Sequence, residues 1–348
     1  MQTSSITIRN SGFELMRIVA MLMIIAHHLA LHGILNCDGD IYNSGNVFNR
    51  LVAQLYFPGG EVGVGLFFMI SGYFLVNSDK KTKLLKLLLQ IIFYGVLLSI
   101  LALYIYRERG GKFQIISAVN YLLVPISSVK WWFATYYILV LLLAPYINPF
   151  LRKLNKKGFI IFLVILYIIE YQLQWRLITP LFRLCMASLF YCLGAYLQLY
   201  TLKISKVGCL SIFALSWIVF SLSRYFETPF YNIFDRMLVV ICCISGFVFF
   251  SNLNFKSKNV NLVAKTTFGI YLLHDNDIIR NFLWNNVFRV APSQYSSEFF
   301  CMLSVVTIIS IFFIGMMIDY CRMRFLEPHY LDFAERTKSK ISNYIFNK

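Results

Sequence analysis

The chain has 348 residues, of which 59% are hydrophobic and only 14% charged, and its mean hydropathy is +0.66. An average soluble domain is about 25% charged, so these charges are too few to cover so many apolar side chains. The composition excludes a disordered chain, a coiled coil and an ordinary soluble enzyme. It predicts a polytopic helical membrane protein, in which each span needs about 20 apolar residues.

Apolar segments recur along the whole chain, and they lack the alternation of strands, so we interpret them as helices. They are residues 13–31, 60–76, 84–106, 131–149, 158–171, 180–200, 207–223, 236–251, 262–283 and 298–320. Pro145 and Pro149 are expected to end the fourth segment. We therefore expect an all-α bundle of about ten transmembrane helices. It would form a single membrane domain over residues 1–348, with spans over about 13–320 and a basic cytoplasmic tail over 321–348.

The lysines and arginines are distributed unevenly between the two sides of such a bundle. If the N-terminus lies inside, 20 of the 32 fall in inside regions and nine in outside regions. This bias predicts that both termini are cytoplasmic and that the number of spans is even. It also explains the net charge of +16 better than nucleic-acid binding does, because the cations lie in short loops between apolar segments. The first segment carries charged residues and no cleavage site follows it, so we do not expect a signal peptide.

The first segment contains the densest set of ionisable residues: Glu14, Arg17, His27 and His28. Such groups cost about 2.5–3.5 kcal/mol each inside a membrane and usually face the bundle interior. Arg17 and His28 are eleven residues apart, which places them within about 20° on one helix face and about 16 Å apart along the axis. Glu14 lies within about 40° of this face, whereas His27 points about 80° away from Arg17. Alternatively, Arg17 snorkels to the headgroups and His28 bonds a backbone carbonyl.

A second polar group, residues 274–277 with Arg280, interrupts the ninth segment. A polar run at this depth is expected to line a cavity, because lipid would expel it. The alternatives are a polar contact within the bundle or an early helix end. The sequence over 131–133 is Trp-Trp-Phe at the start of a segment, and this pattern is most simply an interfacial aromatic belt.

Other patterns mainly exclude chemistries. The glycines over 59–65 are interpreted as close helix packing, because no P-loop lysine accompanies them. G-x-S-x-G, H-E-x-x-H and H-x-x-x-x-D motifs are absent. The eight cysteines are scattered and indicate small core residues. The five histidines have no cysteine at ligand spacing, so we expect no metal site.

Taken in order, these motifs resemble the acyltransferase 3 family of integral membrane O-acyltransferases. Arg17 and His28 match the family's R-x10-H signature on the first helix. The sequence over 62–73 is similar to its second-helix motif, and the sequence over 268–274 to its "FGIYLxH" helix. The "WF…Y…P..N" segment is matched by Trp132, Phe133, Tyr136, Pro145 and Asn148. The matches span almost the whole chain, and about ten helices suit the family.

The resemblance implies transfer of an acyl group, usually acetyl, from cytoplasmic acyl-CoA to a hydroxyl of a surface carbohydrate such as capsule, O-antigen or exopolysaccharide. It implies a multi-pass protein of the plasma (inner) membrane, with acyl-CoA, a carbohydrate or lipid-linked glycan acceptor and membrane lipid as partners. No permanently bound cofactor, metal or nucleic acid is expected. The implied catalytic residues are His28 and Arg17. The implied substrate- or donor-binding residues are Glu14, His274, Lys80, Lys81, Lys83, Trp132 and Tyr136.

Two positions depart from the family pattern. Gly65 stands where many relatives have Asp or Asn, and the family's Arg-x-x-Arg after the second helix is replaced by Lys80, Lys81 and Lys83. Lysine binds phosphate as a point charge, without the planar fork of arginine. The loop is therefore expected to attract phosphate in a different geometry.

A neutral histidine is suited to removing the proton of an attacking sugar hydroxyl near pH 7, and an acyl-histidine intermediate is the other possibility for His28. The main rival function is a non-enzymatic exporter or flippase of a glycan intermediate, with the polar residues lining its path. A glycan polymerase or glycosyltransferase is a further rival, but it needs carboxylates in longer outer loops.

Overall fold

A computed structural model describes residues 10–35, 39–78, 84–108, 131–176, 179–227, 231–290 and 292–346. Within these ranges the ordered elements are helices and no strand occurs, which confirms the all-α prediction. The long helices are α1 (Ser11–His28), α4 (Gly59–Leu75), α5 (Leu85–Glu108), α7 (Trp132–Lys153), α8 (Lys156–Trp175), α9 (Thr179–Leu199), α10 (Lys206–Tyr225), α11 (Tyr231–Ser251), α16 (Phe300–Cys321) and α17 (Glu327–Phe346).

Shorter helices connect and cover them. They are α2 (Gly39–Ser44), α3 (Val47–Tyr56), α12 (Lys258–Ala264), α13 (Thr267–His274), α14 (Asp277–Phe282) and α15 (Pro292–Tyr295). Three π-helical turns extend neighbouring helices: η1 (Leu29–Leu35), η2 (Leu283–Val287) and η3 (Arg322–Leu326).

Eight helical stretches in the described ranges are long and apolar enough to cross a membrane. They correspond to all the predicted segments except the third and the ninth. The third segment forms α5, whose apolar part, Leu85–Leu101, is shorter. The ninth is divided into α12, α13 and α14, and polar residues follow His274, where α13 ends. The chain is therefore a polytopic helical membrane protein.

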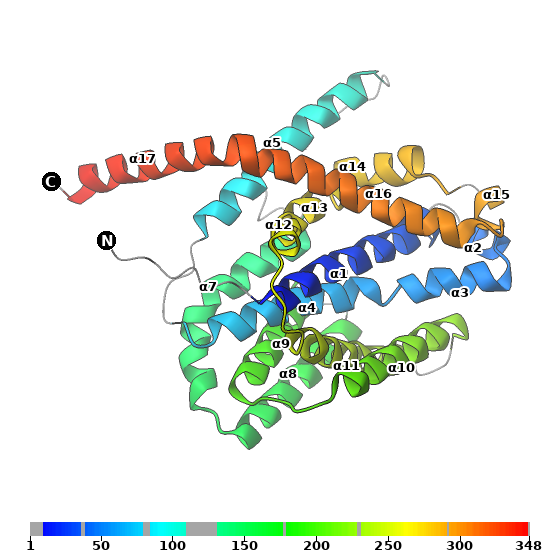
Figure 1. Cartoon of the computed structure of the whole chain (residues 1–348), viewed down its shortest axis with the longest axis horizontal. Coiled ribbons are helices and arrows are strands. Elements are labelled where there is room, and N and C mark those ends of the chain that lie inside the picture. Colours follow the sequence, from blue (N-terminus) through cyan, green and yellow to red (C-terminus); the bar gives the residue numbers. More distant parts are fainter. Residues whose placement is uncertain are drawn as a thin grey trace.

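Helix α1 lies in the middle of the bundle, in contact with α4, α11, α12, α13 and α16 (Figure 1). Its first turn is capped by the side chain of Asn10, which accepts a hydrogen bond of 2.9 Å from the backbone N–H of Gly12. Because α1 touches so many helices, its polar side chains face protein rather than lipid. This position explains how a helix with four ionisable groups is tolerated in the bundle.

Glycines allow α4 to approach both of its main neighbours at backbone distance. A Cβ added to Gly63 would lie 2.7 Å from the carbonyl oxygen of Ala20 on α1. On the other side, a Cβ on Gly72 would lie 1.9 Å from the carbonyl oxygen of Tyr191, and Gly194 of α9 approaches α4 in the same way. Side chains at these positions would push the helices apart. The packing interpretation of the glycines is thus confirmed.

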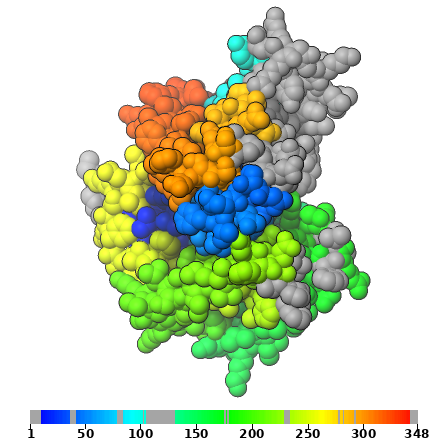
Figure 2. All heavy atoms as spheres, turned by 90° about the vertical axis from the view of Figure 1, so that its right-hand side faces the viewer, coloured from blue at the N-terminus to red at the C-terminus, as the bar shows by residue number. Residues whose placement is uncertain are grey.

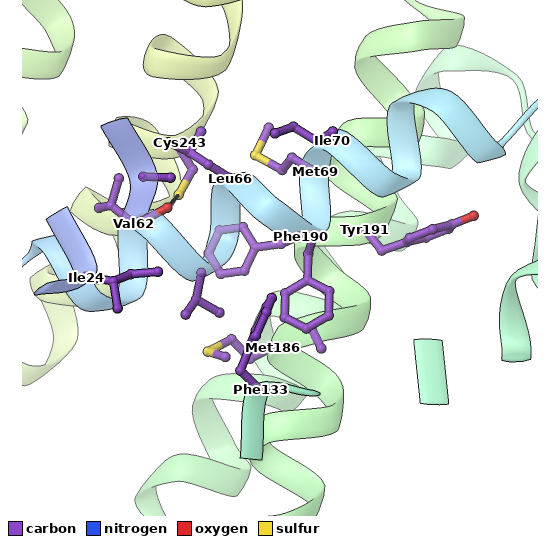
Figure 3. Packing of buried hydrophobic residues seen from close by; sticks show 14 of the residues in the cluster. Ile24, Val62, Leu66, Met69, Ile70, Phe133, Met186, Phe190, Tyr191 and Cys243 are labelled. Atoms are coloured by element: carbon purple, nitrogen blue, oxygen red, sulfur yellow. Dashed lines mark hydrogen bonds between the residues drawn. The ribbon is translucent and has the colours of Figure 1, made fainter. Parts of the chain in front are cut away.

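The core at this crossing combines side chains from several helices (Figure 3). Ile24 of α1, Leu66 of α4, Phe133 of α7 and Phe190 of α9 are all buried. Cys243 of α11 is also buried and lies 3.5 Å from the carbonyl oxygen of Val62. The cysteines of the described ranges are free, as expected for small core residues.

Pro145 and Pro149 lie inside α7, which continues to Lys153. The prediction that they end the helix is therefore wrong. Each proline removes one backbone hydrogen bond, but neighbouring helices stabilise a packed membrane helix through such interruptions. Asn148 supplies such contacts: its amide donates to the carbonyl oxygen of Leu75 at 2.8 Å and its oxygen accepts from the hydroxyl of Tyr191 at 2.9 Å.

The end of the bundle reached by α1 is covered by short helices. Figure 2 looks onto this end of the bundle. There α2 and α3 (blue) have α15 and α16 (orange) on one side and α10 (yellow-green) on the other. The amide of the buried Asn49 on α3 donates to the carbonyl oxygens of Tyr295 and Ser297 at 2.5 and 2.9 Å. These bonds hold α3 against the segment that leads into α16.

At the other end, α17 continues the direction of α16 through η3 and extends beyond the bundle (Figure 1). The predicted basic tail is thus helical as far as Phe346. Its start is anchored by Arg322, whose guanidinium bonds Asp319 and Glu327, both at 2.7 Å. Asp319 is fully buried and also accepts from the hydroxyl of Tyr94 on α5 at 2.6 Å. The buried charges of Asp319, Arg322 and Glu327 are therefore paired with one another.

Candidate functional site

A cavity of about 370 Å³ lies beside the end of α1. His28 is the last residue of α1, at the junction with the π-helical turn η1, and π-helical turns are frequent at functional sites. Three histidines line the cavity: His27, His28 and His32. Asp275 and Arg280 line it as well. The prediction that the polar run of the ninth segment faces a cavity is thereby confirmed for Asp275 and Arg280.

His28 and His274 form a hydrogen-bonded pair inside the protein. His28 Nδ1 lies 3.0 Å from His274 Nε2, and His274 Nδ1 lies 2.7 Å from the carbonyl oxygen of Ile270. A carbonyl only accepts, so the Nδ1 of His274 carries the proton and its Nε2, in the neutral ring, is an acceptor. The Nδ1 of His28 must then donate. In a neutral His28 the Nε2 lone pair is consequently the free, basic one.

The free Nε2 of His28 lies on the side of Asp275, whose Oδ1 is 3.9 Å away. Arg280 Nη1 lies 3.5 Å from the same oxygen. Asp275 is 5% exposed, so its charge requires this partner. Asp275 follows directly after His274, where α13 ends. The early end of this helix therefore turns a carboxylate towards the histidine cluster.

His28, His32 and Asp275 offer ligand atoms that lie within 4.8 Å of one another, a set that could hold a metal ion. The sequence expectation of no metal site overlooked this set. The signal was the four-residue spacing of His28 and His32, which puts both on one helix face. However, the guanidinium of Arg280 already shares the carboxylate, and a second cation at this position would be repelled.

His27 also lines the cavity, together with Gly60 and Glu61. Its Nδ1 lies 2.7 Å from the carbonyl oxygen of Phe57. A Cβ on Gly60 would lie 2.5 Å from the His27 ring, so glycine is needed for this close approach. His27 was expected to point about 80° away from Arg17 on the helix, yet it still lines the cavity. The reason is that α1 packs between α4 and α13 and the cavity extends around the end of α1.

Arg17 belongs to a different cavity, of about 200 Å³, which also contains Lys265, Ser71 and Phe133 among its lining residues. Arg17 Nη1 forms an ion pair of 2.9 Å with Glu14 Oε2. Glu14 is buried, whereas the side chain of Arg17 is 30% exposed. The pair thus leaves part of the guanidinium accessible. Arg17 and His28 share a face of α1, but they serve separate cavities.

Aromatic rings separate the two cavities. Phe133 lines the cavity of Arg17, and Tyr271 lines the cavity of His28. Their rings are in T-shaped contact, with centroids 5.2 Å apart. Phe133 also contacts Phe67 and Tyr137, with centroids 5.9 and 5.6 Å apart. These ring contacts form an aromatic layer between the lining of one cavity and the lining of the other.

The start of α7 is not an interfacial aromatic belt. Trp131 is fully buried and Phe133 is 3% exposed. The indole N–H of Trp131 donates to the carbonyl oxygen of Leu272 at 3.1 Å, which joins the start of α7 to α13. The belt interpretation is wrong because the segment begins inside the bundle. Trp132 lines the His28 cavity, where the guanidinium of Arg183 lies 4.8 Å above its ring.

The remaining predicted binding residues are placed as follows. Tyr136 is buried and does not line the His28 cavity. Lys80, Lys81 and Lys83 lie outside the described residues. The next lysine, Lys86 in the first turn of α5, forms an ion pair with Glu327 of α17.

An ion cluster beside the His28 cavity, in which Arg236 and Glu170 are buried, was also missed from the sequence. Arg236 Nη2 lies 2.9 Å from Glu61 Oε1, and Arg236 Nη1 lies 3.5 Å from Glu170 Oε1. Glu170 lies near the end of the apolar segment 158–171 and is 2% exposed. The signal was an unpaired acidic residue in that segment, because a buried carboxylate requires a cation from another helix.

A family model described as an acyltransferase domain matches residues 10–315 of the chain. This range contains both cavities and all the helices that line them, and it ends inside α16. No curated protein and no solved structure gives a significant match.

Proposed function

Because the chain belongs to the acyltransferase 3 family of membrane acyltransferases, we propose that it transfers an acetyl group from cytoplasmic acetyl-CoA to a hydroxyl of a cell-surface carbohydrate. The single observation that carries the proposal is the hydrogen-bond chain from Ile270 through His274 to His28, which leaves a basic nitrogen free at the cavity. The acceptor would be a capsule, O-antigen, exopolysaccharide or related glycan.

The thioester of acetyl-CoA is already activated, so the acceptor hydroxyl is the partner that needs help. Nε2 of His28 takes the hydroxyl proton as the oxygen attacks the carbonyl carbon of the thioester. When the carbon–sulfur bond breaks, the imidazolium returns this proton to the departing thiolate. The products are an O-acetylated sugar and free CoA. General-base catalysis of this kind contributes about 10²–10⁴-fold.

The presence of two cavities supports separate binding sites for the acyl donor and the sugar acceptor. Arg17 and Lys265 provide two cations in one cavity, and such groups bind phosphates through charge-assisted hydrogen bonds. The nucleotide end of CoA would stay there, while its pantetheine arm reaches past Phe133 and Tyr271. His28 lies about 16 Å from Arg17 along α1, a distance that an extended arm spans. Trp132 would face the sugar in the second cavity.

The topology that accompanies this function has ten crossings and both termini in the cytoplasm of a cell with a plasma (inner) membrane. The Lys and Arg bias of the sequence supports it. In addition, α1 begins and α17 extends at the same end of the bundle (Figure 1). In this orientation the cavity of Arg17 is nearer the cytoplasm and the cavity of His28 nearer the outside.

The test uses purified full-length protein in lipid nanodiscs, labelled acetyl-CoA and de-O-acetylated surface polysaccharide from a deletion strain. Label should move to the polysaccharide with the wild type and not with His28→Ala. NMR of polysaccharide from the parent and deletion strains should show acetyl signals only in the parent. A deletion strain that accumulates unexported glycan with unchanged acetylation would support an exporter instead, and the proposal would fail.

A further inference from the structure

Arginine and carboxylate side chains line the cavity beside the end of α1, and all but one of them have an ion-pair partner within the described residues. Asp275 Oδ1 lies 3.5 Å from Arg280 Nη1, and Glu61 Oε1 lies 2.9 Å from Arg236 Nη2. Arg183 lines the same cavity, but its guanidinium makes no ion pair with any described residue. This cation is therefore available to an anion that enters the cavity.

The contact that the structure does give Arg183 is with an aromatic ring. Its guanidinium carbon lies 4.8 Å from the centroid of the Trp132 ring, and Trp132 lines the same cavity. A ring face attracts the cation, but it does not replace a carboxylate as an acceptor for the five N–H donors. The side chain of Arg183 is half-buried. The ring therefore limits the movement of the guanidinium while its donors stay accessible.

The position of Arg183 in the fold makes this cation costly. It lies in the second turn of α9, a helix long and apolar enough to cross a membrane. Arginines in such helices usually pair with an anion or mark the path of a substrate. Snorkelling to lipid headgroups would be the alternative, but the guanidinium lies over Trp132 at the cavity wall. The cavity volume of about 370 Å³ is in the range of small-molecule sites.

We propose that Arg183 binds an anionic group of the acceptor, a carboxylate or a phosphate, and that the acceptor is therefore an acidic glycan. This assignment rests on the proposed acyl transfer. A planar guanidinium donates two parallel hydrogen bonds to either group. The anion belongs to the acceptor, because the phosphates of the donor are assigned to the other cavity, with Arg17 and Lys265, and the acetyl group carries no charge.

An anion held at Arg183 also limits how the sugar lies in the cavity. Arg183, Trp132 and His28 line one space, so the sugar that carries the anion, or its neighbour in the glycan, presents its hydroxyls to Nε2 of His28. Fixing a reactant in this way favours the productive orientation. Arg183 is thus a specificity-determining residue that selects and orients acidic glycans, while the proton transfer stays with His28.

The first test uses the wild-type protein in nanodiscs and chemically modified acceptors. De-O-acetylated surface polysaccharide from the deletion strain is compared before and after its carboxyl groups are reduced with carbodiimide and borohydride, and before and after its phosphate is removed with hydrofluoric acid. One treatment should lower kcat/KM for the polysaccharide by about 10- to 100-fold, the range of a lost charge-assisted hydrogen bond, and it identifies the anion. If neither lowers kcat/KM by more than about threefold, the proposal is overturned while acyl transfer stands.

The second test combines the treated acceptor with variants of Arg183. Arg183→Gln should lower kcat/KM about 10- to 100-fold with the untreated polysaccharide and less than about threefold with the treated one, because the same contact is lost only once. Arg183→Lys should keep part of the rate, since an ammonium binds the anion without the planar fork. The matched control is Arg176→Gln, which changes an exposed arginine at the end of α8 that does not line the cavity.

The two acceptors also separate the possible failures. An equal loss with both acceptors in Arg183→Gln would assign the guanidinium to the fold, to a lipid headgroup or to the chemical step, and it would overturn the proposal. If the wild type transfers no acetyl group to any of the polysaccharides, the proposed function itself fails.

Discussion

His28 and His274 are 246 positions apart in the chain, and their ring nitrogens lie 3.0 Å from each other. The bond joins the end of α1 to the end of α13. Through it, the carbonyl oxygen of Ile270 determines which nitrogen of His28 is free to accept a proton. A backbone carbonyl thus controls the chemistry of a side chain on another helix.

His274 is accordingly expected to act through His28. His274→Ala should lower kcat by about 10²-fold, because His28 is then free to adopt the wrong tautomer and orientation. The KM for acetyl-CoA should change little. His274→Gln should restore part of the rate, since its amide oxygen accepts from Nδ1 of His28. If Ala and Gln variants are equally active, His274 has no such positioning role.

His28→Ala should abolish acetyl transfer while the amount of protein in the membrane stays normal on an immunoblot. His27→Ala should be milder, with a loss of no more than about tenfold, below the 10²–10⁴-fold of a general base. His27 lines the same cavity, but its Nδ1 is occupied by the carbonyl oxygen of Phe57. A reversed order of the two variants would show that the catalytic imidazole is His27.

Arg17→Ala should weaken the binding of acetyl-CoA by about 10- to 100-fold, the range of a lost charge-assisted hydrogen bond. Binding is measured by isothermal titration with protein in nanodiscs. Lys265→Ala should weaken it as well, because both cations line one cavity. Lys153→Ala, an exposed change at the end of α7, is the control. If His28→Ala lost binding and Arg17→Ala kept it, the nucleotide end of acetyl-CoA would bind near His28, opposite to the proposed orientation.

Gly72→Ala should destabilise the fold. The new Cβ would lie 1.9 Å from the carbonyl oxygen of Tyr191, and backbone atoms cannot turn away as a side chain does. Overpacking typically costs about 1–3 kcal/mol, so the thermal unfolding midpoint should fall clearly. Gly315→Ala is the comparison, because its nearest neighbour is a side-chain atom of Ile270 at 3.2 Å. Equal midpoints for the two variants would contradict the close packing of α4 and α9.

The proposed topology predicts that a reporter fused after Lys348 is active only if it is a cytoplasmic reporter. A reporter inserted after Phe226, between α10 and α11, should be active only outside. The Lys and Arg bias is the reason for both expectations. An active outside reporter after Lys348 would contradict the even number of crossings.

Much of this protein is determined by its sequence alone. Composition and the apolar segments predicted a polytopic helical bundle, because lipid requires each span to satisfy its own backbone hydrogen bonds. The ordered motifs around Arg17, His28 and His274 identified the family, and the polar run after His274 was expected at a cavity. These inferences are local: they depend on the length of a segment, its period, or the spacing of residues on one helix.

The tertiary structure decided which of these residues meet. It brings His28 against His274, assigns Arg17 to a separate cavity, buries Trp131 and continues α7 past Pro145. No periodicity within one helix contains this information, because it depends on which helices pack together and at what distance. Here, backbone contacts at Gly63 and Gly72 set the position of α4 against α1 and α9. The cavities, and the aromatic layer between them, result from that packing.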